Sequence, residues 1–88
     1  MSVRVEFFGI PRERAGVDAV NLRNPATLGH ALQMLTTRLP ALAASCIADG
    51  RLKSGYLANL NGERFTTDPE SPLQPGDAVL ILSADVGG

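Results

Sequence analysis

One stretch of helical periodicity constrains the fold of this chain more than any other feature. Between residues 28 and 39, apolar side chains recur at spacings of three and four: Leu28, Ala31, Leu32, Leu35 and Leu39. Residues at these spacings share one face of a helix, and such a face must be buried against another element. Thr27 precedes the stripe and is a suitable N-cap. The sequence therefore predicts one main amphipathic helix that begins at Leu28 and covers a second layer.

Short alternating segments on both sides of this helix predict strands that form the second layer. They lie near residues 3–7, 19–23, 56–60, 63–65 and 78–83. Asn61-Gly62 predicts a tight hairpin, and Pro75-Gly76 predicts a type II turn that leads into the last strand. Five short strands and one main helix predict an α+β domain in which the helix covers one face of a mixed sheet.

The connecting segments carry weaker signals. Residues 12–16 (RERAG) are expected to form a solvated turn, in which Gly16 is a turn or a helix stop. Pro40 marks either a boundary or the first turn of a second short helix through Cys46 and Ile47. Residues 49–55 (DGRLKSG) are expected to form a polar loop.

The last strand, AVLILS at residues 78–83, is apolar on both of its faces. Val79 and Ile81 point one way, whereas Leu80 and Leu82 point the other way. A sheet that one helix covers has a single core face, so the second face needs an explanation. Either a loop covers it, or it is an exposed patch that includes Phe8 and docks a partner.

Size and charge exclude several classes of protein. A domain of 88 residues forms one modest core with little room for a buried active site. The net charge of −1 gives no footprint for nucleic acid or an anionic membrane. Apolar runs are far shorter than a membrane span, and the first residues do not resemble a secretory signal. We therefore expect a cytoplasmic protein.

Individual side chains give little support for an independent enzyme. His30, the only histidine, is expected on the polar face of the helix. Cys46 is expected to be a buried apolar residue, because one cysteine cannot hold a metal alone. Arg12–Arg14, Arg51 and Lys53 are expected to be solvated, with contact to an acidic partner as the alternative. No phosphate-binding loop, CxxC pair or nucleophile elbow is present, so no metal or bound cofactor is expected.

The order of several segments resembles the MoaD/ThiS family of ubiquitin-like sulfur carriers. These segments are VRVEFFGIPRERAG at the start, NGE at residues 61–63, LQPGDAVLIL at residues 73–82, and a terminal Gly87-Gly88. The opening segment is more similar to the MoaD branch, the small subunit of molybdopterin synthase. The resemblance covers the whole chain and implies a β-grasp fold, with residues 1–82 as the domain and residues 83–88 as a flexible tail.

The resemblance also implies a function. In this family, an adenylating enzyme of the ubiquitin-activating type uses ATP and magnesium to convert the terminal glycine carboxylate into an acyl-adenylate. A sulfur donor then forms a thiocarboxylate, which a partner enzyme consumes. The implied reactive residues are Gly88 and Gly87, and the implied acceptor is the large molybdopterin synthase subunit. The carrier is then a sulfur-donating subunit or co-substrate.

The stretch before the glycines departs from the family pattern. Many relatives carry proline there, whereas this chain has Ser83-Ala84-Asp85-Val86. Because that stretch enters the partner, Val86 joins Phe8, Leu80 and Leu82 as a predicted partner-binding residue. The departure leaves other acceptors open, namely thiamine thiazole formation and cysteine or homocysteine synthesis. A ubiquitin-like protein modifier is a further alternative.

The chemistry explains why such a tail ends in glycine. A terminal carboxyl, with a pKa of roughly 3.3–3.7, is an anion at neutral pH and must be activated from outside. Glycine has no Cβ, so the walls of a partner's active site can approach its backbone closely. Six residues from Ser83 onward extend to about 20 Å, which is enough to cross a partner's surface.

Overall fold

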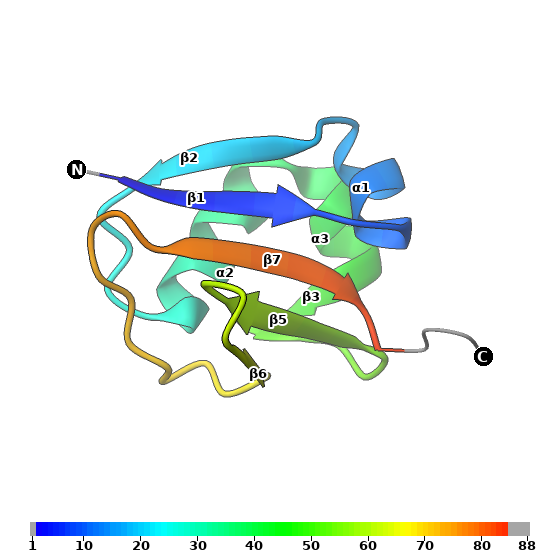
Figure 1. Cartoon of the computed structure of the whole chain (residues 1–88). Helices are drawn as coiled ribbons and strands as arrows, with labels where there is room; N and C mark the ends of the chain where they lie inside the picture. Colours follow the sequence, from blue (N-terminus) through cyan, green and yellow to red (C-terminus); the bar gives the residue numbers. More distant parts are fainter. Residues whose placement is uncertain (1, 85–88) are drawn as a thin grey trace.

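The computed structural model describes residues 2–84, and its main sheet has five strands in the order β2-β1-β7-β5-β6 (Figure 1). The strands are β1 (Ser2–Phe7), β2 (Ala19–Arg23), β5 (Tyr56–Leu60), β6 (Arg64–Thr66) and β7 (Ala78–Ser83). β1 and β7 pair in parallel, and the other neighbouring strands are antiparallel. The sheet is therefore mixed, as predicted, and β7 is its central strand.

Three helices accompany the sheet: α1 (Ile10–Ala15), α2 (Leu28–Arg38) and α3 (Pro40–Cys46). The main helix, α2, and the shorter α3 lie behind the sheet in Figure 1 and cover the same face. α1 lies at the end of the sheet, where it contacts α3 and β7. This strand and helix order is the β-grasp arrangement, so the predicted fold is confirmed.

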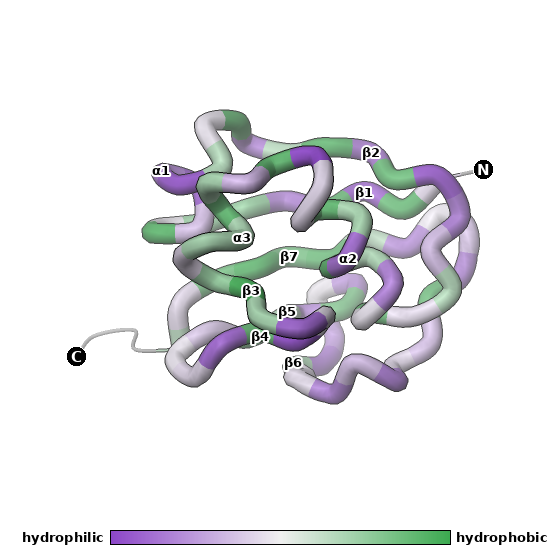
Figure 2. The backbone as a smooth tube through the Cα atoms, turned by 180° about the vertical axis from the view of Figure 1, so that it is seen from behind, coloured by the Kyte–Doolittle hydropathy of each residue, from purple (hydrophilic) through white to green (hydrophobic). Residues whose placement is uncertain are grey.

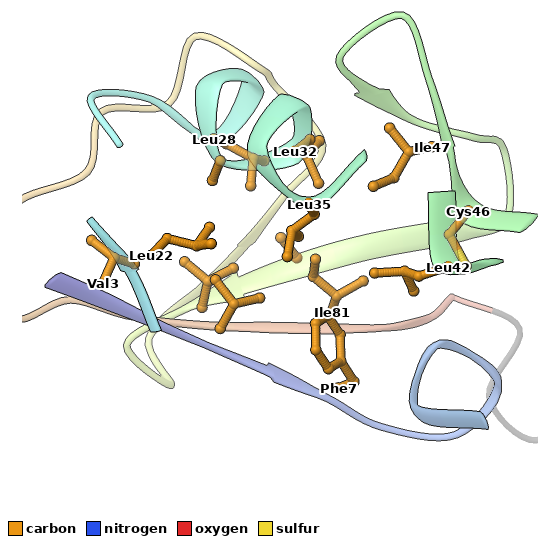
Figure 3. Close-up of a cluster of buried hydrophobic side chains, with 14 of the residues drawn as sticks. Val3, Phe7, Leu22, Leu28, Leu32, Leu35, Leu42, Cys46, Ile47 and Ile81 are labelled. Carbon is orange, nitrogen blue, oxygen red and sulfur yellow. The ribbon is translucent and has the colours of Figure 1, made fainter. Parts of the chain in front are cut away.

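The core lies between α2, α3 and one face of the sheet. Figure 3 shows Leu28, Leu32 and Leu35 of α2 pointing toward the sheet, where Val3, Phe7, Leu22 and Ile81 meet them. Four of the five residues in the predicted stripe are fully buried, and Leu39, which follows the helix, is half-buried. Burial of one leucine side chain contributes about 1.5–3 kcal/mol, so this stripe supplies a large part of the stability.

The N-terminus of α2 is capped as the sequence predicts, and a distant loop completes the cap. The Thr27 hydroxyl oxygen accepts from the His30 N–H at 3.1 Å. The two preceding N–H groups donate to loop carbonyls: Leu28 to Ser71 at 2.9 Å, and Gly29 to Pro69 at 2.8 Å. The loop can approach this closely because residue 29 has no side chain. A Cβ there would lie 3.0 Å from the Pro69 Cβ and 3.1 Å from its carbonyl oxygen.

We expect Gly29→Ala to lower the free energy of unfolding by about 1–3 kcal/mol, the usual cost of an overpacked contact. Alanine favours a helix by only about 0.5–1 kcal/mol over glycine, which is too little to reverse the sign. Urea unfolding monitored by circular dichroism measures the difference. Thr37→Ala, at an exposed position of the same helix, is the matched control. A Gly29→Ala protein as stable as the wild type would contradict the close approach.

The turns between strands have the predicted backbone conformations. Asn61 and Gly62 have φ angles of 57° and 70°, as a type I′ hairpin requires. Gly76 has a φ of 89°, and the Asp77 N–H donates to the Gln74 carbonyl at 3.0 Å, as in a type II turn. Asn61 also ties the two turns together, because its side-chain oxygen accepts from the Ala78 N–H at 2.8 Å.

Two connecting segments differ from the prediction. Residues 10–15 form α1 rather than a turn, because Pro11 occupies the first turn of a helix and is buried. Arg12–Arg14 are exposed, as predicted, and Gly16 is the predicted helix stop, which ends α1 in the left-handed conformation. Residues 49–52 of the expected loop at 49–55 belong to a small hairpin, in which β3 (Ile47–Ala48) pairs with β4 (Arg51–Leu52). Asp49 and Gly50 form its turn, with φ angles of 53° and 72°. The second short helix after Pro40 is present as α3.

Candidate functional site

The face of the sheet opposite the helices carries an apolar patch, which we call the outer patch. It consists of five residues from four strands or strand ends: Phe8, Leu57, Phe65, Leu80 and Leu82. Phe8 and Phe65 are 60% and 63% exposed, and the three leucines are half-buried. The second face of β7 is therefore only partly covered. Large apolar side chains gathered on a small domain indicate a contact surface.

Strand register, rather than sequence proximity, assembles the outer patch. Leu82 lies opposite Leu57 of β5, and the parallel pairing of β1 with β7 continues to place Phe8 beside Leu82. The Phe8 N–H donates to the Ile81 carbonyl at 3.0 Å, which fixes this position. Two residues further along β5, Asn59 pairs with Leu80 of β7 on one side and with Phe65 of β6 on the other side. In Figure 2 the β7 trace is hydrophobic along its length.

The outer patch adjoins the point at which the described chain ends. The Ala84 N–H donates to the Gly55 carbonyl at 2.7 Å, and Ser83 lies opposite Tyr56. Leu82 is thus two residues from the last described position. The outer patch therefore lies next to the point from which residues 85–88 continue.

The side chains beneath this end of the sheet are not arranged for nucleophilic chemistry. Cys46 is fully buried, as predicted, and its burial raises the pKa of the thiol despite a hydrogen bond with Tyr56. The pKa of Tyr56 is raised by burial and by the neighbouring Cys46. A thiol that stays protonated at neutral pH is a poor nucleophile. Cys46 is therefore a core residue in this fold.

The helix side carries shallow, open hollows. One hollow is lined by Thr27, His30, Gln33 and Glu70, among others, near the start of α2. The first N–H groups of α2 all have acceptors within the protein, so they are not available to an anion. Among residues 2–84, no group of three histidine, cysteine or acidic side chains is placed to hold a metal ion. No helix in this part of the chain is long and apolar enough to cross a membrane.

The structure brings three of the predicted site residues together. Phe8, Leu80 and Leu82 lie on the outer patch, whereas Val86, Gly87 and Gly88 fall outside the described residues. Leu57 and Phe65 belong to the same patch but were not among the predicted contact residues. Leu57 directly precedes the buried Ala58, and consecutive residues of a strand point to opposite faces of the sheet. The alternation along β5 is therefore the signal that indicates an outward side chain at Leu57.

The model of the ThiS family matches residues 5–88. This chain belongs to the ThiS family. The match begins within β1 and runs through Gly88, so it includes the Gly-Gly end as well as most of the sheet. The resemblance to the MoaD/ThiS group of ubiquitin-like sulfur carriers is confirmed, although the comparisons do not single out the MoaD branch. No match was found among curated proteins.

Solved structures of similar proteins share the fold over nearly the whole chain. SAMP1 from Haloferax volcanii, a small archaeal modifier protein, is 27% identical with a TM-score of 0.84, and the match covers 100% of both chains. A chain from the BexX/CysO complex of Amycolatopsis orientalis is 22% identical with a TM-score of 0.78, covering 98% of this chain and 99% of that one.

A third similar structure comes from the complex of subunits 1 and 2 of the molybdopterin-converting factor of Helicobacter pylori. It is 20% identical with a TM-score of 0.66, and the match covers 100% of both chains. The last two structures are of complexes between two proteins, and at these identities they establish the β-grasp fold alone. The ThiS family member described here has the same ubiquitin-like body.

Proposed function

We propose that this ThiS family protein is a sulfur carrier whose Gly88 carboxylate is converted to a thiocarboxylate. The observation that carries the proposal is the family match, which extends through Gly88. In the proposed cycle, a Gly88 carboxylate oxygen attacks the α-phosphate of ATP and pyrophosphate leaves. Hydrosulfide released by a sulfur donor then attacks the carbonyl carbon of the acyl-adenylate, AMP and a proton leave, and the thiocarboxylate remains.

The partner supplies the catalytic groups in this proposal. ATP and magnesium act in the adenylating enzyme, where donors or the metal stabilise the charge that develops at the Gly88 carbonyl. The carrier contributes a thin, substrate-like end. Ordering each residue after Ala84 in the partner's cleft costs roughly 1–2 kcal/mol of backbone entropy. Burial of the outer patch against the partner offsets that cost, which gives Phe8, Leu80 and Leu82 a role next to the point at which residues 85–88 begin.

We assign the sulfur to molybdopterin synthesis, with a large molybdopterin synthase subunit as the acceptor. The MoaD-like opening segment and the fold shared with subunit 1 or 2 of a molybdopterin-converting factor support this assignment. Thiazole formation and cysteine or homocysteine synthesis use the same loaded end. Capture of partners from the native cell distinguishes these acceptors from molybdopterin synthase. Recovery of a different acceptor enzyme would overturn the molybdopterin assignment and leave the sulfur-carrier proposal standing.

The loading step has a direct test. The purified protein is incubated with an adenylating enzyme of its own cell, ATP, magnesium and a sulfur donor, and its intact mass is measured. We expect the mass to rise by one oxygen-to-sulfur exchange, localised to the C-terminal peptide. The control omits ATP. A mass that stays unchanged while the enzyme forms the acyl-adenylate would refute the carrier proposal.

A second candidate function is a ubiquitin-like protein modifier, which the similarity to SAMP1 favours. In that case Gly88 is joined to lysine side chains of other proteins. Antibody detection in a cell lysate would then reveal a ladder of larger species, and deletion of Gly87 and Gly88 would remove it. A lysate that contains only the free protein would refute the modifier function and leave the sulfur-carrier proposal standing.

A further inference from the structure

The positive charge of this protein is carried almost entirely by arginine. The chain has seven arginines and one lysine, Lys53. This difference is chemical as well as electrostatic. A lysine amine loses its proton with a pKa near 10.4 and then attacks activated acyl groups, whereas arginine stays protonated in proteins. Apart from the N-terminal amine, Lys53 is the single amine that an activated carboxyl can acylate.

Lys53 lies close to the point from which residues 85–88 continue. The Tyr56 N–H donates to the Lys53 carbonyl at 3.2 Å, closing a turn over residues 53–56. Such a turn brings its end Cα atoms within about 7 Å, and paired strand residues are about 4.5–5.5 Å apart. Since Tyr56 lies opposite Ser83, the Lys53 and Ser83 Cα atoms are within about 12–13 Å by these limits.

Residues 84–88 are long enough to close this distance. Five residues extend to about 17 Å at most, before the length of the lysine side chain is added. The Lys53 ammonium donates to the Ala44 carbonyl at 2.7 Å at the end of α3. Lys53 itself is exposed, so water can replace that carbonyl as the acceptor. An activated Gly88 can therefore reach this amine within one molecule.

The described chain begins at the other end of the sheet, at Ser2. β1 and β7 run parallel, and Arg4 lies opposite Ala78, the first residue of β7 (Figure 1). Ser2 is therefore separated from Ala84 by more than the length of β7. Six strand residues span about 20 Å, beyond the reach of residues 85–88. Ser2, where the described chain begins, is therefore out of reach of residues 85–88, whereas Lys53 lies near Ser83 and Ala84.

We propose that Lys53 is the self-acylation site of this protein, the amine that captures its own activated Gly88 when no partner consumes it. The inference rests on the proposed function, since the activated group is the acyl-adenylate or an equivalent thioester. The neutral Lys53 Nζ attacks the Gly88 carbonyl carbon. An amide bond forms, AMP or the thiol leaves, and the amine proton passes to water. The product is a lariat in which residues 53–88 are closed into a ring.

The test uses the full chain carrying a C-terminal alkyl thioester, released from an intein fusion, so that no adenylating enzyme is needed. At mildly alkaline pH we expect a monomer lighter than the free acid by one water. It should form at a rate independent of protein concentration. After tryptic cleavage, the ring appears as a branched peptide that joins residues 52–64 to residues 65–88.

Three variants separate this site from non-specific acylation. Lys53→Arg should lower the lariat yield at least tenfold and leave hydrolysis as the main outcome. Adding Ser54→Lys to Lys53→Arg restores an amine in the same turn and should restore the ring. Adding Arg38→Lys instead places the amine beside β2, where Arg38 contacts the Asn21 carbonyl, and should not restore it.

Two results would overturn the inference: a thioester that only hydrolyses, or a ring whose yield is unchanged in Lys53→Arg. Neither result touches the carrier proposal, because the thioester bypasses adenylation. Conversely, if adenylating enzymes fail to load Gly88 but the thioester closes on Lys53, the self-acylation site stands and the carrier proposal fails.

Discussion

Removal of Gly88 is expected to lower sulfur loading by at least about 100-fold while leaving thermal stability unchanged. The shortened chain still ends in a glycine carboxylate, so the chemistry of the group is preserved. Its reach, however, falls by about 3.3–3.6 Å. Misplacement of a reacting atom by even 1 Å can cost about 100-fold in rate. The carboxylate would therefore stop short of the α-phosphate.

Stability should not change because the described core and its backbone hydrogen bonds are made by residues before 85. The core ends at Ile81, and the last backbone hydrogen bond of the described chain joins Ala84 to Gly55. Intact mass measures loading, and circular dichroism measures the melting temperature. Addition of one alanine after Gly88 is the matched variant, since it displaces the carboxylate in the opposite direction and should also abolish loading. Equal loading in both variants and the wild type would contradict the proposed role of Gly88.

Long periodic segments account for the part of the fold that the sequence predicts. The stripe from Leu28 to Leu35 is buried only if this segment is a helix that packs on another layer, and the alternating segments predict that this layer is a sheet. The turns at Asn61-Gly62 and Pro75-Gly76 are specified locally, because few residues accept their positive φ angles. For these elements, local preference and tertiary packing agree.

The short elements depend on tertiary contacts that the sequence does not display. α1 has six residues, too few to establish a helical period, and its Pro11 becomes informative only once it is known to be buried. β3 and β4 have two residues each. The Asp49-Gly50 pair is a hairpin signal, but the strands beside it are too short to alternate visibly.

Only part of the candidate site was predictable, because the sequence displays alternation within one strand but not the pairing between strands. The two apolar faces of β7 are visible in AVLILS, and they identify Leu80 and Leu82. Leu57 and Phe65 join them only through the pairing of β5 with β6 and β7. Register is set by the whole sheet, so a patch that spans strands is seen completely only in the structure.

Leu80→Asp is expected to weaken binding to the adenylating enzyme and to the acceptor by at least about 30-fold, because an unpaired charge would be buried at the centre of the contact. Leu80 is half-buried on the outer patch, away from the helices, so the fold should persist; a melting curve verifies this. Isothermal titration or surface plasmon resonance measures affinity.

Two further variants separate the effect of lost apolar contact from the effect of the added charge. Leu80→Ala removes contact without adding charge and should weaken binding by a smaller factor. Gln33→Glu adds the same charge at an exposed position of α2, on the opposite side of the molecule, and should leave affinity unchanged. Because the patch and Gly88 act at one partner surface, Leu80→Asp should also slow loading at limiting enzyme, and saturating enzyme should restore it. Unchanged affinity in a folded Leu80→Asp protein would mean that partners hold this carrier by another surface.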